Sequence, residues 1–117
     1  MASIHRVNRV RELLLRELSD IVSRLKDPRI GMVTVVDTGI SRDLKYATMY
    51  VSVLGSETQK QETLAALESA RGFMRREIAR RISLRFVPEL RIEYDETGER
   101  AARITELLDG LHGRQHE

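Results

Sequence analysis

The chain has 117 residues, a formal net charge of +2 and no cysteine. This length is typical of one domain with a modest core, and the missing cysteines exclude a disulfide framework, a thiolate metal site and a cysteine nucleophile. No stretch approaches the ~20 apolar residues of a membrane span, and the first residues lack the apolar run of a signal peptide. We therefore expect a soluble, single-domain protein.

The positive charge is concentrated in one segment. Between Arg71 and Arg91 there are seven basic residues and only two acidic ones, Glu77 and Glu89, whereas the rest of the chain has 13 basic and 16 acidic residues. Only three of the 20 basic residues are lysine. Because the planar guanidinium of arginine suits phosphate, this segment is a candidate for contact with an anionic partner. A codon bias toward arginine is the alternative explanation.

Apolar residues near the N-terminus recur at steps of three and four, which predicts an amphipathic helix of about six turns. Ser3 is a suitable N-cap. Pro28 disfavours helical geometry at Asp27, so we expect the helix to end near Lys26. The apolar stripe of this helix consists of Ile4, Val7, Val10, Leu14, Leu18, Ile21, Val22 and Leu25.

Two strands are expected next, over residues 32–40 and 46–54, joined by a short polar link. The first is rich in β-branched residues. The second alternates, which places Ala47, Met49, Val51 and Val53 on one face and predicts a half-buried strand. An antiparallel hairpin is the simplest connection between them.

The sequence from Ser56 to Gln59 fits a capping box, so a helix should start at Glu57 and run into the arginine-rich segment. A last strand is expected around Leu90, Ile92 and Tyr94, with Pro88 at its start, at a bulge or at an edge.

A short closing helix should follow the last strand, and residues 113–117 should form a disordered tail. The apolar stripe of that helix is Ile104, Leu107, Leu108 and Leu111. The sequence thus predicts an α+β fold in one domain, residues 1–112, with the order α-β-β-α-kink-α-β and a C-terminal helix. Because two helices separate the second strand from the last, the helices can pack on a three-stranded mixed sheet that contains a parallel pair.

Gly72 interrupts the predicted helix after Glu57, where glycine costs about 1 kcal/mol relative to alanine. If this helix were continuous, Arg71 would project from the middle of its apolar arc, and burying a guanidinium is costly. A kink formed by Ala70 and Gly72, with Gly72 in a conformation that other residues resist, would free Arg71 to face water. The alternative is a straight helix with a glycine needed for close packing. The apolar arc consists of Leu64, Leu67, Ala70, Met74, Ile78 and Ile82.

The side of the second half-helix away from Met74 and Ile78 is almost entirely basic, and it begins at a helix N-terminus, which favours phosphate. A solvated charged face is the alternative interpretation. The candidate residues for contact with an anionic backbone are Arg71, Arg75, Arg76 and Arg80, with Arg6, Arg9 and Arg85 as weaker candidates.

The sequence gives only weak support for an enzyme. Asp37, Asp43, Asp95 and Glu96 suggest a carboxylate site only superficially, because Asp is common in turns. His112 and His116 have a metal-ligand spacing, but Gly113 and the chain end disfavour a rigid helix there. We find no phosphate-binding glycine loop and no nucleophile elbow. We therefore expect no catalytic residue, no metal site and no cofactor.

Several motifs, in this order and over nearly the whole chain, resemble those of the bacterial ribosome-binding factor A family. They are RVRELLLRELSDIV, DPRIG, SRDLKYATMYVSV, ARGFMRREI, LRFVPELRIEYDE and RITELL. The resemblance implies a type II KH-like fold and a cytoplasmic, non-enzymatic assembly factor that binds the free 30S ribosomal subunit. It also implies a role in late maturation of 16S rRNA near its 5′ end and in growth in the cold.

KH domains clamp nucleotides with a GXXG loop, whereas this family has an Ala-X-Gly kink, matched here by Ala70, Arg71 and Gly72. We therefore expect a monomer that recognises a structured ribosomal surface through phosphates. Few of the five Phe and Tyr residues should be free to stack on bases. Ribosomal proteins are further candidate partners, and a membrane is not. The alternative function is a protein-interaction module that docks a partner through its sheet or first helix.

Overall fold

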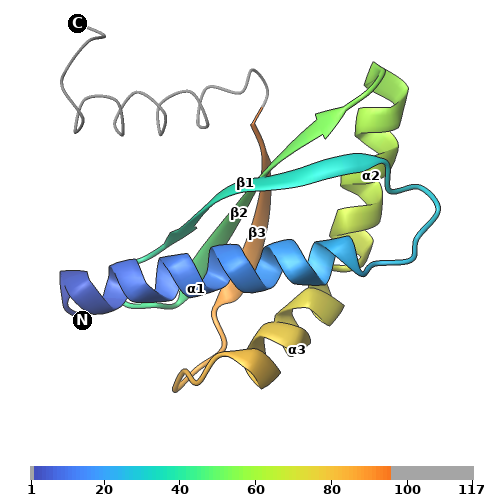
Figure 1. Ribbon diagram of the computed structural model, residues 1–117. Coiled ribbons are helices and arrows are strands. Elements are labelled where there is room, and N and C mark those ends of the chain that lie inside the picture. Colours follow the sequence, from blue (N-terminus) through green and yellow to red (C-terminus); the bar gives the residue numbers. More distant parts are fainter. Residues whose placement is uncertain (1, 96–117) are drawn as a thin grey trace, which may run out of the picture.

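The computed structural model describes residues 2–95 (Figure 1). The predicted closing helix and tail, with His112 and His116, lie outside these residues. The elements are α1 (Ile4–Ser23), β1 (Met32–Ile40), β2 (Tyr46–Leu54), α2 (Glu57–Ser69), α3 (Arg71–Arg81) and β3 (Glu89–Tyr94). The predicted α+β fold, with helices on a three-stranded mixed sheet, is confirmed.

Helix α1 begins where the sequence predicts, because the Ser3 Oγ accepts a hydrogen bond from the Arg6 N–H at 3.1 Å. It ends at Ser23 rather than near Lys26, so the predicted end was wrong. The N–H groups of Arg24 and Leu25 bond to the carbonyls of Ile21 and Val22, three residues back. This tighter final turn ends the helix before Pro28 can affect it.

The sheet has the order β1-β2-β3. Strand β2 lies in the centre, antiparallel to β1 and parallel to β3, with a register shift in β1 between Val35 and Asp37. Helices α2 and α3 make the crossover that the parallel pair requires.

The hairpin between β1 and β2 is held by side chains. Asp43 Oδ1 and Ser41 Oγ both accept hydrogen bonds from the Lys45 N–H, at 3.0 and 3.1 Å. Leu44 has a φ of 63°, a left-handed conformation that is rare for a branched residue, and its side chain packs against the core. The backbone of Lys45 is thereby fixed, and its carbonyl accepts the Glu89 N–H where β3 begins.

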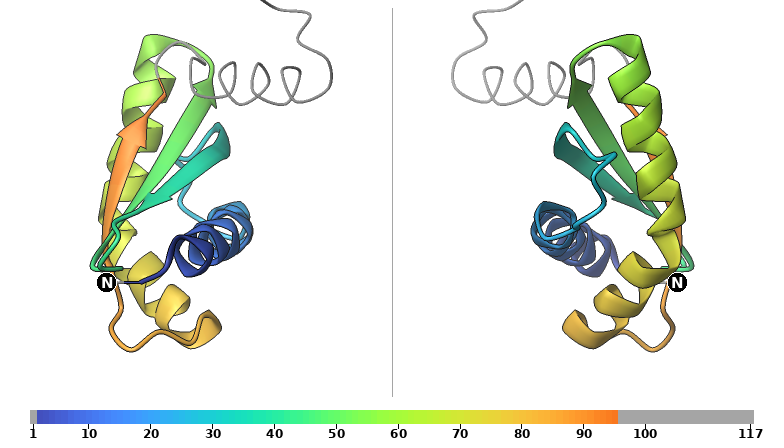
Figure 2. Two further views of the ribbon diagram at one scale, coloured as in Figure 1. Left: turned by 90° about the vertical axis from the view of Figure 1, so that its left-hand side faces the viewer. Right: turned by 90° about the vertical axis from the view of Figure 1, so that its right-hand side faces the viewer.

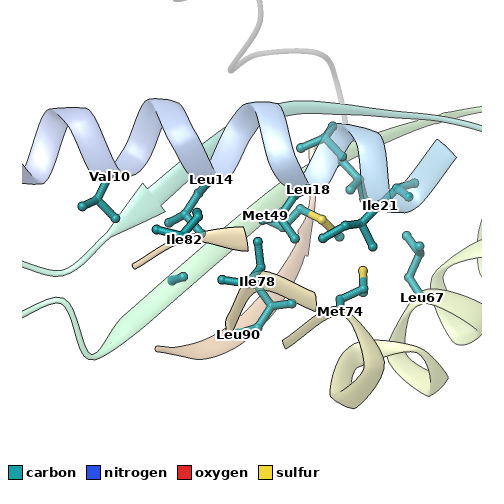
Figure 3. Close-up of a cluster of buried hydrophobic side chains, with 14 residues drawn as sticks. Val10, Leu14, Leu18, Ile21, Met49, Leu67, Met74, Ile78, Ile82 and Leu90 are labelled. Atoms are coloured by element: carbon teal, nitrogen blue, oxygen red, sulfur yellow. The ribbon is translucent and has the colours of Figure 1, made fainter. Parts of the chain in front are cut away.

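The core lies between the sheet and the three helices (Figure 3). The predicted inward face of β2, from Ala47 to Val53, is buried, and its residues Ala47, Met49 and Val51 share one cluster with residues of α1, α2 and α3. Figure 2 shows α3 and the segment after it at the end of the molecule where β2 and β3 begin. The core therefore holds α3 with its opposite side facing outward.

The first member of the predicted α1 stripe, Ile4, is not in the core. Leu18 is completely buried, whereas Ile4 is 52% exposed. Leu18→Ala should therefore lower the free energy of unfolding by about 3 kcal/mol, because it leaves a cavity. Ile4→Ala, the matched control in the same helix, should change it by less than about 1 kcal/mol. Urea denaturation measures both, and similar values for the two variants would contradict this core assignment.

Candidate nucleic-acid interface

The helix pair α2–α3 changes direction at a single residue. Ala70 lies between the two helices with φ −89° and ψ 0°, and its N–H still bonds to the carbonyls of Ala66 and Leu67. Met74 is then fully buried, while Arg71 is exposed and lies 3.6 Å from the Glu68 carboxylate. The corner thus turns the apolar side of α3 inward and places Arg71 in solvent.

Gly72 does not supply the unusual backbone conformation that we expected. It lies in the first turn of α3, and Gly55 is the only described glycine with a positive φ. A methyl group at position 72 would meet nothing closer than the Arg76 guanidinium, at 3.5 Å. Since neither backbone nor packing requires glycine here, the direction change is made by Ala70.

Gly72→Ala should therefore stabilise the protein by about 0.5–1 kcal/mol, because glycine is a poorer helix former than alanine. Gly55→Ala is the contrasting control, since Gly55 has a φ of +140° and a Cβ there would collide with the Gln59 side chain of the capping box. It should destabilise by about 1 kcal/mol or more. Thermal and urea unfolding measure both, and a destabilised Gly72→Ala would restore the backbone role of this glycine.

The side of α3 that faces away from Met74 and Ile78 carries Arg76 and Arg80, and we call this surface the arginine face. Arg71 is also exposed, but it lies nearly opposite Arg80 around the helix and lines a hollow with Glu89 and Leu90 of β3. Arg80 is paired with Glu77 at 2.7 Å, on the solvent side. Arg76 makes no ion pair with any residue between 2 and 95. Since an exposed pair such as Arg80–Glu77 is weak, both guanidinium groups are available to an incoming anion.

Arg75, another predicted RNA-binding residue, is used differently. Its Nε donates to the Pro88 carbonyl at 3.1 Å, and its Nη2 donates to the Val87 carbonyl at 3.1 Å. These bonds satisfy two backbone acceptors just before β3 and fasten this segment to α3. Arg75 is therefore a positioning residue for the segment that follows α3.

Arg81 joins α3 to α1, a role that the sequence analysis did not assign. Its Nη1 lies 2.7 Å from Asp20 Oδ2 and 3.2 Å from Glu17 Oε1, and its Nε lies 3.5 Å from Glu77 Oε1. The Arg81 hydrogen bond, followed by that from Arg24, lowers the pKa of Asp20. The same contact with Asp20 raises the pKa of Arg81. This network holds α3 against α1.

Arg81→Met, which keeps most of the aliphatic stem, should lower the melting temperature at neutral pH. Because the folded-state pKa of Asp20 lies below its ordinary value of 3.8, the stability it contributes is complete above that pH. That stability is lost as the pH falls through the lowered pKa. The deficit of Arg81→Met should therefore shrink between about pH 7 and about pH 2.5. A deficit of equal size at both pH values, followed by circular dichroism, would show that packing rather than charge is responsible.

The three weaker candidates lie near one another. Arg6 and Arg85 line a hollow together with Lys45, and Arg6 and Arg9 line an adjoining one. We call these four residues the basic corner. It joins the start of α1, the β1–β2 hairpin and the segment after α3, and Lys45 could not be assigned to it without the fold. Asp43 also lines the first hollow, but its carboxylate is engaged with Ser41 and the Lys45 N–H.

Two phenylalanines are exposed to solvent. Phe86 is 67% exposed and Phe73 is 45% exposed. Phe86 and Val87 form one wall of a groove of about 370 Å³, and Gly72, Arg75, Arg76 and Ala79 form the rest. We call it the Phe86 groove. It opens beside the arginine face.

The structure gives little support for a carboxylate site or a metal site. Asp37 lies 3.4 Å from the Arg11 guanidinium and accepts a hydrogen bond from the Thr38 N–H. The ion pair holds α1 against β1, and both contacts indicate a structural role for Asp37. Within residues 2–95, no group of three or more His, Cys, Asp or Glu side chains could hold a metal ion. None of the helices described here is long and apolar enough to cross a membrane. Glu96 lies outside the described residues.

The fold and this surface define a small α+β domain with an arginine-rich side suited to nucleic acid. The chain belongs to the ribosome-binding factor A family, since a sequence model of that family matches residues 6–108.

Solved structures support this assignment. The crystal structure of ribosome-binding factor A from Thermus thermophilus has a TM-score of 0.68 and 27% identity, over 75% of this chain and 93% of that chain. A Thermotoga maritima protein described as a ribosome-binding factor A, solved by NMR, has a TM-score of 0.70 and 33% identity, over 84% and 93%. A homology model of the Thermus thermophilus protein, fitted into a cryo-EM map of its 30S complex, has a TM-score of 0.59 and 30% identity, over 69% and 86%.

Proposed function

We propose that this protein is a non-catalytic, RNA-binding assembly factor of the free 30S ribosomal subunit. The observation that carries the proposal is the family match over residues 6–108, together with the Thermus thermophilus relative that was fitted into a map of a 30S complex. By extension from the family, it acts in the cytoplasm as a monomeric, KH-like protein, during late maturation of 16S rRNA near its 5′ end. Growth in the cold would depend on it most.

The arginine face and the basic corner are the proposed contacts with rRNA. Arg76 and Arg80 reach outward on α3, and Arg6, Arg9, Lys45 and Arg85 extend the positive surface around one end of the molecule. Guanidinium groups can bond phosphates bidentately, so the surface can follow an RNA backbone without reading its sequence.

Binding would act on assembly by selecting one conformation of the subunit. A ligand shifts an equilibrium only by its difference in affinity for the two states. A protein that fits one arrangement of the maturing rRNA therefore favours that arrangement without any bond being made or broken. In this proposal the rigid α1–α3 pair, joined through Arg81, presents the cations at fixed spacing.

Arg76→Ala/Arg80→Ala should weaken cosedimentation with free 30S subunits and flatten its salt dependence. Removing one arginine–phosphate pair should reduce the log–log salt slope by about 0.7–0.9. The matched control is Arg16→Ala/Arg24→Ala, which removes two exposed arginines from the C-terminal half of α1 and its C-cap. If the two double variants bind alike, or if neither changes the salt slope, the arginine face is not the rRNA contact.

One observation favours the second candidate, a module that docks a protein. Met32 and Leu54 are cross-strand partners at the far end of the β1–β2 pair, and they are 71% and 73% exposed. Apolar side chains that lie together at a sheet end can bind a protein partner. Met32→Ser/Leu54→Ser should then weaken a binding that is insensitive to salt.

A further inference from the structure

We propose that the Phe86 groove holds one unpaired RNA nucleotide, with its base stacked on the Phe86 ring and its phosphate at Arg76. This inference rests on the proposed RNA-binding function and deepens it, because it names the form of RNA that is bound. It assigns a stacking role to one of the few aromatic side chains that are exposed.

Phe86 is unusually exposed for an aromatic residue. It belongs to the segment between α3 and β3, and two thirds of its surface is open to water, at 67%. Two hollows meet at this residue, the Phe86 groove on one side and the hollow of Arg6, Lys45 and Arg85 on the other. The ring is therefore positioned between two basic surfaces instead of packing on the core.

The segment that carries Phe86 is held in place by hydrogen bonds to its backbone. Arg75 binds the carbonyls of Val87 and Pro88, the two residues after Phe86. The N–H of Glu89 bonds to the Lys45 carbonyl at 2.8 Å, which fixes the start of β3. A surface that is already ordered loses little conformational entropy when a ligand binds, so the stacking energy is not spent on ordering the loop.

Arg85 does not cover all of the Phe86 ring. The Arg85 guanidinium lies 5.4 Å from the ring centroid and lines the hollow that Phe86 shares with Arg6. Arg85 does not line the Phe86 groove, so it does not cover the part of the ring that lines the groove. Aromatic rings that stack on bases, flanked by cations for the backbone, are a common arrangement in proteins that bind single strands.

The floor of the Phe86 groove is formed by α3 and carries positive charge. The residues that line it on α3 are Gly72, Arg75, Arg76 and Ala79, which share one side of the helix at steps of three and four. Gly72 and Ala79 leave room between the two arginines, and none of the acidic residues between 2 and 95 lines the groove. With no side chain at Gly72, the backbone of α3 is accessible at the floor of the groove.

The test uses the full chain and two RNA probes, a single strand of about ten nucleotides without self-complementarity and a blunt duplex of about ten base pairs. In the duplex the bases are already stacked and paired, so only its phosphates are available. Phe86→Leu keeps an apolar side chain but removes the aromatic face. It should weaken single-strand binding about fivefold to a hundredfold, as expected for one stacked base, and leave duplex binding unchanged.

A direct readout is possible because the chain has no tryptophan. Phe86→Trp should bind the single strand at least as tightly as the original protein, and its fluorescence should be quenched by the single strand but not by the duplex. Phe73→Trp is the matched control, since Phe73 is also exposed on α3 but does not line the groove. Its fluorescence should change little. Melting temperatures should stay close to that of the original protein, because Phe86 is largely exposed.

The outcomes separate this inference from the proposed function. If Arg76→Ala weakens both probes and Phe86→Leu weakens neither, RNA binding stands and the stacking site is wrong. Equal quenching of the two tryptophan variants would also overturn the stacking site. If the original protein binds neither RNA probe, and Phe86→Leu still binds 30S subunits normally, both the inference and the RNA contact at this surface fail.

Discussion

The change of helix direction at Ala70 is the constraint on which the rest of this surface depends. One straight helix from Glu57 to Arg81 would carry Arg71 on the same side as Leu67 and Met74, where burying its guanidinium would be costly. With the corner in place, Leu67 and Met74 are both fully buried, each from its own helix. Arg76 and Arg80 are consequently directed to solvent, and α3 can pack on α1.

The arginines of this segment have two different roles. Arg75 and Arg81 are structural, because the first binds backbone carbonyls of the segment before β3 and the second binds carboxylates of α1. Within residues 2–95, Arg76 and Arg80 make no such structural contact apart from the ion pair between Arg80 and Glu77. The structural arginines hold a rigid surface, and the exposed ones give it charge. A count of basic residues alone would not separate these roles.

Much of the fold was predictable, because it depends on local patterns. The alternation of β2, the Ser3 cap and the capping box of Ser56 and Gln59 all act within a few residues, and all were confirmed. Ile4 continues the apolar period but lies beyond the part of α1 that the sheet and α3 cover. Periodicity describes one side of a helix and not how far its partners extend.

The candidate site was less predictable, because it is assembled from segments that are distant in sequence. Lys45, Arg85 and Arg6 come together only through the β1–β2 hairpin and the start of β3. The exposure of Phe86 follows from the bonds that Arg75 makes to the next two residues, and no short-range pattern encodes them. Gly72 lacks the backbone conformation that the sequence suggested, and the change of direction lies at Ala70 instead.

The central claim is that the outer side of α3, together with the segment after it, meets RNA. The most direct measurement is a titration of the isotopically labelled protein with the single-stranded RNA, followed by two-dimensional amide NMR. The account predicts shift changes grouped at residues 71–80 and 84–87, with smaller ones at the basic corner. Changes grouped at Met32 and Leu54, with α3 unaffected, would contradict it.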